Sequence, residues 1–163
     1  MGSVALPRGW IAVDAKLRGK RYRIIDTHLE GLDPVVQGAQ TQELVNGPAL
    51  SPNAVVIAGD LNSDADNPDS TFGPAYQILL SAGFVDSWAT VHPGDPGYTI
   101  PLFLEDPYAP STPSRRIDLI LTHDGTDTIT AFDSIRIGLT DLTPSGLFPS
   151  DHVGVVSSFV LEP

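Results

Sequence analysis

The sequence has no cysteine among its 163 residues, which excludes a disulfide framework, a thiol nucleophile and a cysteine-based zinc site. Basic residues are also scarce, with 9 Lys and Arg against 20 Asp and Glu, for a net charge of −11. Proteins that grip duplex nucleic acid usually present a basic surface, and the basic residues group here only at Arg115-Arg116 and in the segment 18–23. Tight non-specific DNA binding by these residues alone is therefore not expected, and the acidity also fits a simple role in solubility.

Long apolar runs are missing as well. No run approaches the roughly 18 residues of a membrane-spanning helix, and the segment 1–8 is too short and too polar for a secretory signal. The compartment stays open, because a chain without cysteine suits either side of a membrane. The length fits one domain, and a hydrophobic content of 41% is ordinary for a globular fold. We assign residues 1–9 to a start or linker and 10–163 to the domain.

The residues that are present predict about seven strands and two helices, an α/β arrangement in which strands outnumber helices. A glycine turn at 18–20 joins two strands, Trp10–Leu17 and Arg21–Leu29, into a hairpin. An Asp-Pro pair at 33–34 predicts the start of a helix that runs to about residue 44. The second helix is expected at 74–82, the other strands at 54–58, 84–88, 117–122, 129–137 and 153–161, and an irregular loop at 92–113.

Polar clusters lie at the ends of several of these apolar strands. They are Asp26-Thr27-His28-Leu29, Gly59-Asp60-Leu61-Asn62, Arg116-Ile117-Asp118-Leu119-Ile120 and Ser150-Asp151-His152. Carboxylates gathered at strand ends repel one another unless a cation lies among them. The pattern therefore predicts a divalent metal ion and chemistry on an anionic group.

Each cluster also has a plainer structural interpretation. Asp60 and Asn62 are residue types that form turns after strands, although a carboxylate can bind Mg²⁺ or orient a water and an amide can donate to a phosphoryl oxygen. Asp118 interrupts an apolar strand and needs a partner, which could be a histidine, a metal ion or a neighbouring arginine. Asp151 and His152 pair a hard metal ligand with a proton carrier, or lie in a solvated loop. His28 has similar chemistry and a similar alternative.

Taken together and in order, Thr27-His28-Leu29, Gly59-Asp60-Leu61-Asn62, Arg116-Ile117-Asp118 and Ser150-Asp151-His152 resemble the later motifs of the endonuclease/exonuclease/phosphatase (DNase I-like) superfamily. The resemblance covers nearly the whole chain from about residue 10. It implies a β-sandwich flanked by helices and a hydrolase of phosphoester bonds, whose substrate is a small molecule, a lipid head group or nucleic acid.

The resemblance also implies roles for single residues. Asp60 would position the attacking water and help bind a metal ion, and Asn62 would contact the scissile phosphate. Asp118 would hold the ring of His152, which contacts the phosphate or takes a proton. Asp151 would be a metal ligand, and His28 would assist the leaving group. The implied cofactor is Mg²⁺ or Mn²⁺, which would neutralise charge on the phosphoryl oxygens.

The sequence departs from the family at its beginning. Members start with a strand that carries an Asn, followed by a strand that carries a metal-binding Glu, and neither motif is present, so the chain resembles the second half of the domain. We therefore expect poor turnover by this chain alone. We also expect an uncovered apolar sheet face that favours self-association or a partner. The alternative functions are a split or degenerate module that binds a partner without catalysis, and an acidic β-rich binding domain with coincidental motifs.

Overall fold

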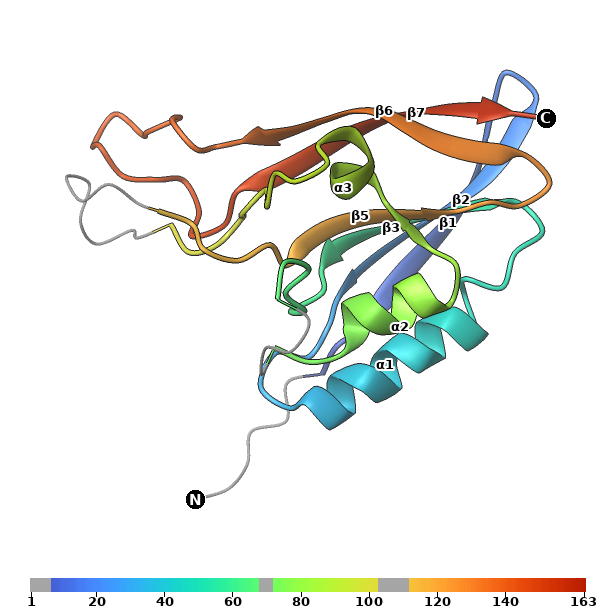
Figure 1. The fold of residues 1–163 in the computed structure, drawn as a ribbon, viewed down its shortest axis with the longest axis horizontal. Coiled ribbons are helices and arrows are strands. Elements are labelled where there is room, and N and C mark those ends of the chain that lie inside the picture. The colour runs from blue at the N-terminus through green and yellow to red at the C-terminus, as the bar shows by residue number, and fades with distance from the viewer. Residues whose placement is uncertain (1–6, 68–71, 103–111) are drawn as a thin grey trace.

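The computed structural model describes residues 7–67, 72–102 and 112–163 and has the mixed α/β architecture that the sequence predicts. Its elements follow the chain in a simple order (Figure 1). They are β1 (Trp10–Leu17), β2 (Lys20–His28), α1 (Pro34–Asn46), β3 (Ala54–Asp60), α2 (Ala75–Ser81), β4 (Val85–Asp86), α3 (Ser87–Val91), β5 (Asp118–His123), β6 (Thr128–Ile137) and β7 (Gly154–Glu162).

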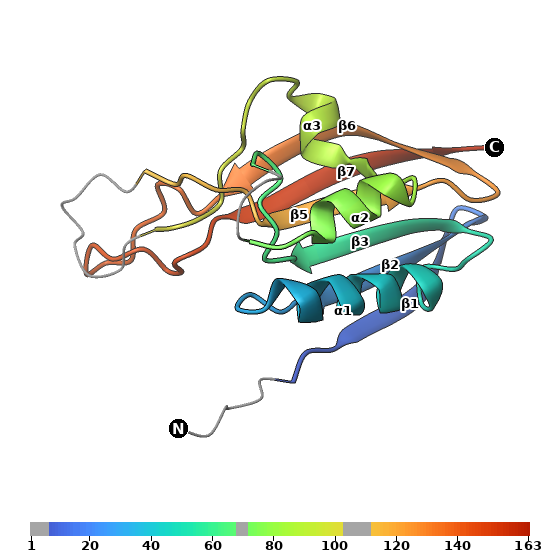
Figure 2. The same ribbon diagram turned by 60° about the horizontal axis from the view of Figure 1, so that its bottom comes forward.

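The strands form two sheets. The larger sheet has the order β1-β2-β3-β5-β4, in which β2 and β3 are parallel and the other neighbours antiparallel, and β6 and β7 form a two-stranded antiparallel sheet. Helices α1 and α2 cover one face of the larger sheet, and β6–β7 lies over the other face (Figures 1 and 2). The main core is therefore between the helices and the larger sheet, where Ile25, Ile57 and Leu79 are fully buried.

Local chemistry explains why α1 begins where the sequence predicts. The Asp33 carboxylate accepts hydrogen bonds from the backbone N–H groups of Val35 at 2.9 Å and Val36 at 3.2 Å. Pro34 occupies the first helical position, where a missing N–H costs nothing. The helix continues to Asn46, two residues beyond the predicted end.

The segment expected to be one strand at 84–88 is different. Only Val85–Asp86 pairs with β5, and the chain then enters α3, which raises the number of helices in the described residues to three. The Asp86 carboxylate causes the change, because it accepts hydrogen bonds from the backbone N–H groups of Trp88 and Ala89 and so caps a helix. The expected loop at 92–113 lies partly outside the described residues, since 103–111 are not described.

An exposed apolar face lies on the β1–β2 hairpin, away from α1. Ile11 and Val13 in β1 are 66% and 54% exposed, and Ile24, which pairs with Val13 across the hairpin, is 38% exposed. The self-association or partner binding expected of such a face stays a prediction. Within the described ranges, no helix has the length and apolar character needed to cross a membrane.

Candidate active site

Asp118 and His152 form a hydrogen-bonded pair at the point where β5 begins and the chain approaches β7. The Nδ1 atom of His152 lies 3.0 Å from Oδ1 and 2.9 Å from Oδ2 of Asp118, and both side chains are partly buried. The alternative of an ion pair with a neighbouring arginine is not what the structure has. Arg116 pairs with Asp86 at 2.6 Å, and the Arg115 guanidinium lies over an aromatic ring.

The register of the larger sheet brings Asp60 to the same place. Asp60 ends β3, where it pairs with His28 of parallel β2 on one side and with Asp118 of antiparallel β5 on the other. Donor atoms of Asp60, Asp118 and His152 all lie within 4.8 Å of one another. The Nε2 atom of His28 lies 3.3 Å from Oδ2 of Asp60, with the histidine side chain half exposed. Residues far apart in the sequence (His28, Asp60, Asp118 and His152) therefore meet at one end of the central strands of the larger sheet.

A glycine makes this register possible. Gly59 precedes Asp60 with a φ of +144°, a conformation that residues with side chains rarely adopt. A Cβ atom at this position would overlap the backbone carbonyl oxygen of Thr27, the residue that Gly59 pairs with in β2. The close approach of the two strands thus requires glycine, and it fixes His28 opposite Asp60.

Asn62 lies in the turn that follows. Its backbone has a φ of +49°, which is uncommon for a residue other than glycine. Its backbone N–H donates to Oδ1 of Asp60 at 2.9 Å, and its side-chain Nδ2 donates to the carbonyl oxygen of Leu29 at 3.0 Å. The amide is therefore held beside the end of β2, against the residue that follows His28.

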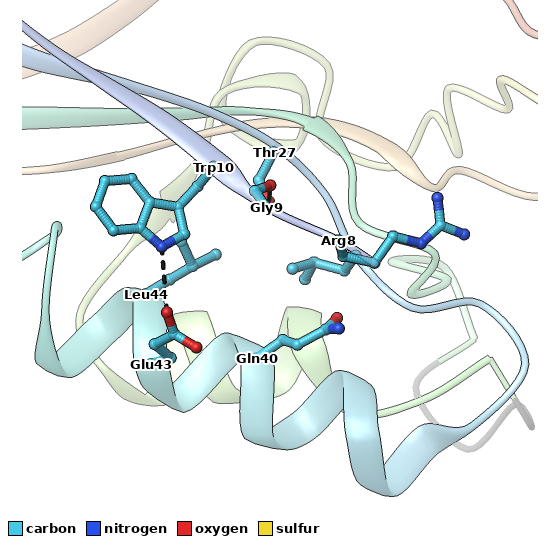
Figure 3. A pocket seen from close by; sticks show the side chains of 8 residues that line it. Arg8, Gly9, Trp10, Thr27, Gln40, Glu43 and Leu44 are labelled. Carbon is cyan, nitrogen blue, oxygen red and sulfur yellow. Dashed lines mark hydrogen bonds between the residues drawn. The ribbon is translucent and has the colours of Figure 1, made fainter. Parts of the chain in front are cut away.

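Two open cavities flank Asp60. One, of about 500 Å³, includes Asp26, His28 and Asp60 in its lining, and the other, of about 200 Å³, includes Asp60, Asp118 and Val153. A smaller cavity of about 70 Å³ lies between the hairpin and α1, on the other face of the sheet (Figure 3). It contains none of the predicted site residues.

Asp151 is the least integrated of the predicted site residues. Its side chain is exposed, and within the described residues it is not part of the group that Asp60, Asp118 and His152 form. Its backbone carbonyl accepts a hydrogen bond from the N–H of Leu102 at 2.7 Å, so the position is fixed by the main chain. A role as metal ligand stays a prediction.

The electrostatics of the pair follow from partial burial. Burial raises the pKa of Asp118 above its ordinary value, against hydrogen bonding from Thr99 and the charge of His152, which lower it. For His152, burial alone would lower the pKa, but the charge and hydrogen bond of Asp118, with smaller effects of Asp60 and Asp151, raise it above 6.5. The site therefore stabilises the protonated form of the imidazole relative to a histidine in water.

Thr99 is a site residue that the sequence did not indicate. It is fully buried, and its Oγ1 accepts from the backbone N–H groups of Ile117 and Asp118 at 3.3 Å. Its carbonyl oxygen accepts from the N–H of Val153 at 2.8 Å, directly after His152. Thr99 thus joins the start of β5, which carries Asp118, to the segment just before β7, which carries His152. Its position in a proline-rich segment predicted to be irregular gave no signal.

Such an arrangement has a definite chemical capacity. With Nδ1 of His152 engaged by a carboxylate, Nε2 is the nitrogen left for a proton or a phosphoryl oxygen. The oxygens of Asp60 and Asp118 are hard donors of the kind that Mg²⁺ and Mn²⁺ prefer. The site is suited to binding a cation and an anionic group side by side.

Sequence comparison gives one clear match. The profile of the Endonuclease/Exonuclease/phosphatase family matches residues 8–152. No curated protein sequence matches the chain.

Solved structures with the same fold include three that differ in their described roles. TDP2 of D. rerio, complexed with a single-strand DNA product, is 19% identical with a TM-score of 0.70, over 94% of this chain and 62% of that one. The mannosyl-6-phosphatase Bt3783 of Bacteroides thetaiotaomicron VPI-5482 is 19% identical with a TM-score of 0.65, over 98% and 59%. An endonuclease/exonuclease/phosphatase of Beutenbergia cavernae DSM 12333 is 23% identical with a TM-score of 0.70, over 96% and 40%. The chain therefore spans 40–62% of the length of these structures.

Proposed function

The chain belongs to the Endonuclease/Exonuclease/phosphatase family, and from this premise we propose that it hydrolyses phosphoester bonds by in-line attack of an activated water. The observation that carries the proposal is the convergence of Asp60, Asp118 and His152 at one sheet edge. In-line attack on a phosphate depends on positioning and on stabilising negative charge more than on covalent help. The cluster would offer positioning through its side chains, and charge stabilisation through His152 and a bound cation.

The roles of the side chains follow from what each can donate or accept. His152, oriented by Asp118, contacts a phosphoryl oxygen or takes a proton through Nε2. Asp60 orients the attacking water, and Asn62 donates to the scissile phosphate. His28, half exposed beside Asp60, assists the leaving group.

The donor set fits a hard divalent cation. The carboxylate oxygens of Asp60 and Asp118 lie in one group, and Asp151 lies next to His152 in the chain. We propose that Mg²⁺ or Mn²⁺ binds at this end of the sheet to Asp60 and to Asp151, whose exposed side chain would have to turn toward the group that Asp60 forms with Asp118 and His152. When bound, such an ion supplies charge neutralisation at phosphoryl oxygens.

We propose a substrate class narrower than that of the family. Proteins of similar structure include one complexed with single-strand DNA and a mannosyl-6-phosphatase. With 9 basic and 20 acidic residues, this chain favours a small or lipid-like phosphodiester over duplex DNA. We also propose that residues 10–163 form part of the family's domain. By itself this part should hydrolyse its substrate slowly.

A second function, binding of a partner without catalysis, is favoured by a separate observation. The hairpin face that carries Ile11, Val13 and Ile24 is exposed, and its apolar character suits a protein contact. In this interpretation the site residues would be retained only as structure.

Hydrolysis assays separate the two functions. Bis-p-nitrophenyl phosphate and plasmid DNA are incubated at high protein concentration with Mg²⁺, Mn²⁺ or EDTA, and wild type is compared with Asp151→Ala and His152→Ala. We expect slow, metal-dependent hydrolysis that both substitutions reduce. Hydrolysis that persists in His152→Ala would point to a contaminant, and no hydrolysis under any condition would favour the binding module. Full Mg²⁺-dependent turnover would contradict the expected weakness of the chain alone.

A further inference from the structure

One buried amide in α1 ties together two connections next to the site, β2–α1 and β3–α2. Gln37 is 1% exposed and lies in the first turns of the helix. Its Nε2 is 2.9 Å from the carbonyl oxygen of Glu30, 2.8 Å from that of Asn62 and 3.0 Å from that of Phe72. Its Oε1 accepts from the N–H of Ala75, the first residue of α2, at 3.1 Å. Four backbone groups thus depend on one side chain.

The orientation of this amide has only one satisfactory solution. Three carbonyl oxygens share the two hydrogens of Nε2, and the N–H of Ala75 needs an acceptor, so Nε2 must face the carbonyls and Oε1 must face α2. Helices α1 and α2 lie side by side (Figure 2), and Gln37 bridges the start of one to the start of the other. A carboxylate at this position would turn an oxygen toward carbonyl oxygens, and an apolar side chain would leave several buried polar groups unpaired.

The surroundings of Gln37 are shaped to it. Gly73 has a φ of +87°, and a Cβ atom there would overlap Oε1 of Gln37. Gly31 lies against Asn62 in the same way, since its Cβ would be 2.7 Å from Oδ1 of Asn62. The Oγ of Ser63, next to Asn62, donates to the carbonyl oxygen of Gly73 at 2.9 Å. The loop after β3 is thus attached to the segment before α2 at two adjacent points.

Asn62 needs this support. Its left-handed backbone is unfavourable for a residue with a side chain, and it persists where neighbouring contacts hold it. The backbone N–H of Asn62 is bound by Asp60, its side chain by Leu29, and its carbonyl by Gln37. Asp60 ends β3 and Leu29 directly follows β2, whereas Gln37 lies in α1, so Gln37 links the position of Asn62 to the helical layer.

We propose that Gln37 is a positioning residue, which sets the conformation of the Asp60–Asn62 turn and so aligns Asn62 with the scissile phosphate. The proposal rests on the proposed hydrolysis, and it adds a residue that makes no contact with the substrate. Loss of the amide should leave substrate binding nearly intact and lower the rate of the chemical step, because a displacement of about 1 Å at a reacting group costs about 100-fold.

The test is the change Gln37→Met, which keeps the length of the side chain and removes its hydrogen bonds. The matched control is Gln40→Met, one turn further along α1, whose Oε1 accepts, among the described residues, from the N–H of Glu30. We expect kcat for bis-p-nitrophenyl phosphate to fall about 10-fold or more in Gln37→Met with little change in KM, and to stay within about twofold in Gln40→Met. Both proteins are assayed well below their unfolding transitions.

A double-mutant cycle distinguishes positioning from a general loss of structure. If Gln37 acts through Asn62, then Gln37→Met should lower kcat no further in an Asn62→Ala background, although its effect on unfolding remains. An additive loss of kcat would overturn the proposal. If Gln37→Met does not fold, Gln37→Asn, which keeps a shorter amide, takes its place.

Amide hydrogen exchange provides a readout that does not need activity. In Gln37→Met, the amides of Ala75 and Asn62 should lose protection together by about 10-fold or more, whereas Gln40→Met should affect Glu30 alone. Protection of Asn62 that stays unchanged while that of Ala75 is lost would overturn the inference even in an inactive chain. Absence of hydrolysis with the expected exchange pattern would instead count against the proposed function.

Discussion

Replacing Asp118 by asparagine tests the chemistry of the site most directly. The two groups have nearly the same shape, but the amide carries no charge and presents an N–H toward Nδ1 of His152, which lies 2.9–3.0 Å from both carboxylate oxygens. The pKa of His152 is above 6.5 because Asp118 outweighs burial. Without that charge, burial dominates, and the pKa of His152 should fall below its ordinary value.

The expected loss of rate follows from the role of an oriented imidazole. General acid–base catalysis by a positioned side chain contributes about 10²–10⁴-fold, which corresponds to about 3–5 kcal/mol of transition-state stabilisation. We expect Asp118→Asn to lose a factor in this range in kcat, because the ring loses both its charge partner and its fixed tautomer. Stability should show the same coupling. A raised folded pKa of His152 stabilises the fold below the unfolded value of 6.5, and this contribution is lost as pH rises through the folded pKa.

Two measurements check the reasoning. NMR titration of the imidazole protons in EDTA gives the pKa of His152 directly, and a pH–rate profile gives kcat. Asp151→Asn serves as a control for the titration, since Asp151 contributes least among the groups that raise this pKa and should lower it only slightly when neutralised. A His152 pKa that stays above 6.5 in Asp118→Asn, or a kcat within about threefold of wild type, would show that the pair does not work as described.

Other predictions concern the support of the site and its surface. Thr99→Val should lower kcat about 10-fold, because it removes the hydroxyl that bonds Asp118. Thr99→Ser keeps this hydroxyl and should retain most of the wild-type kcat. Asp86→Ala leaves the buried Arg116 without its ion-pair partner. The free energy of unfolding should fall by about 3–5 kcal/mol and the melting temperature by about 6–20 °C. A fall below about 1 kcal/mol in thermal unfolding would contradict this. Ile24→Lys should reduce any concentration-dependent association seen by sedimentation. A wild-type protein that is monomeric at every concentration would refute the expected self-association. Chelation by EDTA should abolish hydrolysis, and addition of excess Mn²⁺ or Mg²⁺ should restore it.

Periodicity and turn chemistry predicted most of the elements. The hairpin strand Trp10–Leu17 has the predicted bounds, and the helix from Pro34 begins at its cap because an Asp-Pro pair acts locally. The short helix after Asp86 was missed for a physical reason. Five residues that mix apolar side chains with one aspartate fit both a strand and a short strand that ends at a helix cap, and the hydrogen bond from the Trp88 N–H to Asp86 is visible only in the structure.

The convergence of the site was only partly visible in the sequence. Strand-end clusters could be found as separate motifs, but the register that places His28 and Asp118 on either side of Asp60 belongs to long-range pairing. Thr99 and Gln37 gave no signal, because a buried threonine in a proline-rich segment and a glutamine in a helix are common residue types. Their importance comes from carbonyl and amide groups that other parts of the chain bring to them.

The bare glycine at position 59 limits how this protein can vary. Any added methyl group would meet the Thr27 carbonyl and force β2 away from β3, which would move His28 from Asp60. In a library randomised at this codon and selected for retained hydrolysis, we expect survivors to encode glycine alone, while positions on the outer hairpin surface accept many replacements. The position in the site that tolerates the fewest residue types is thus one where the α-carbon must carry hydrogen in place of a side chain.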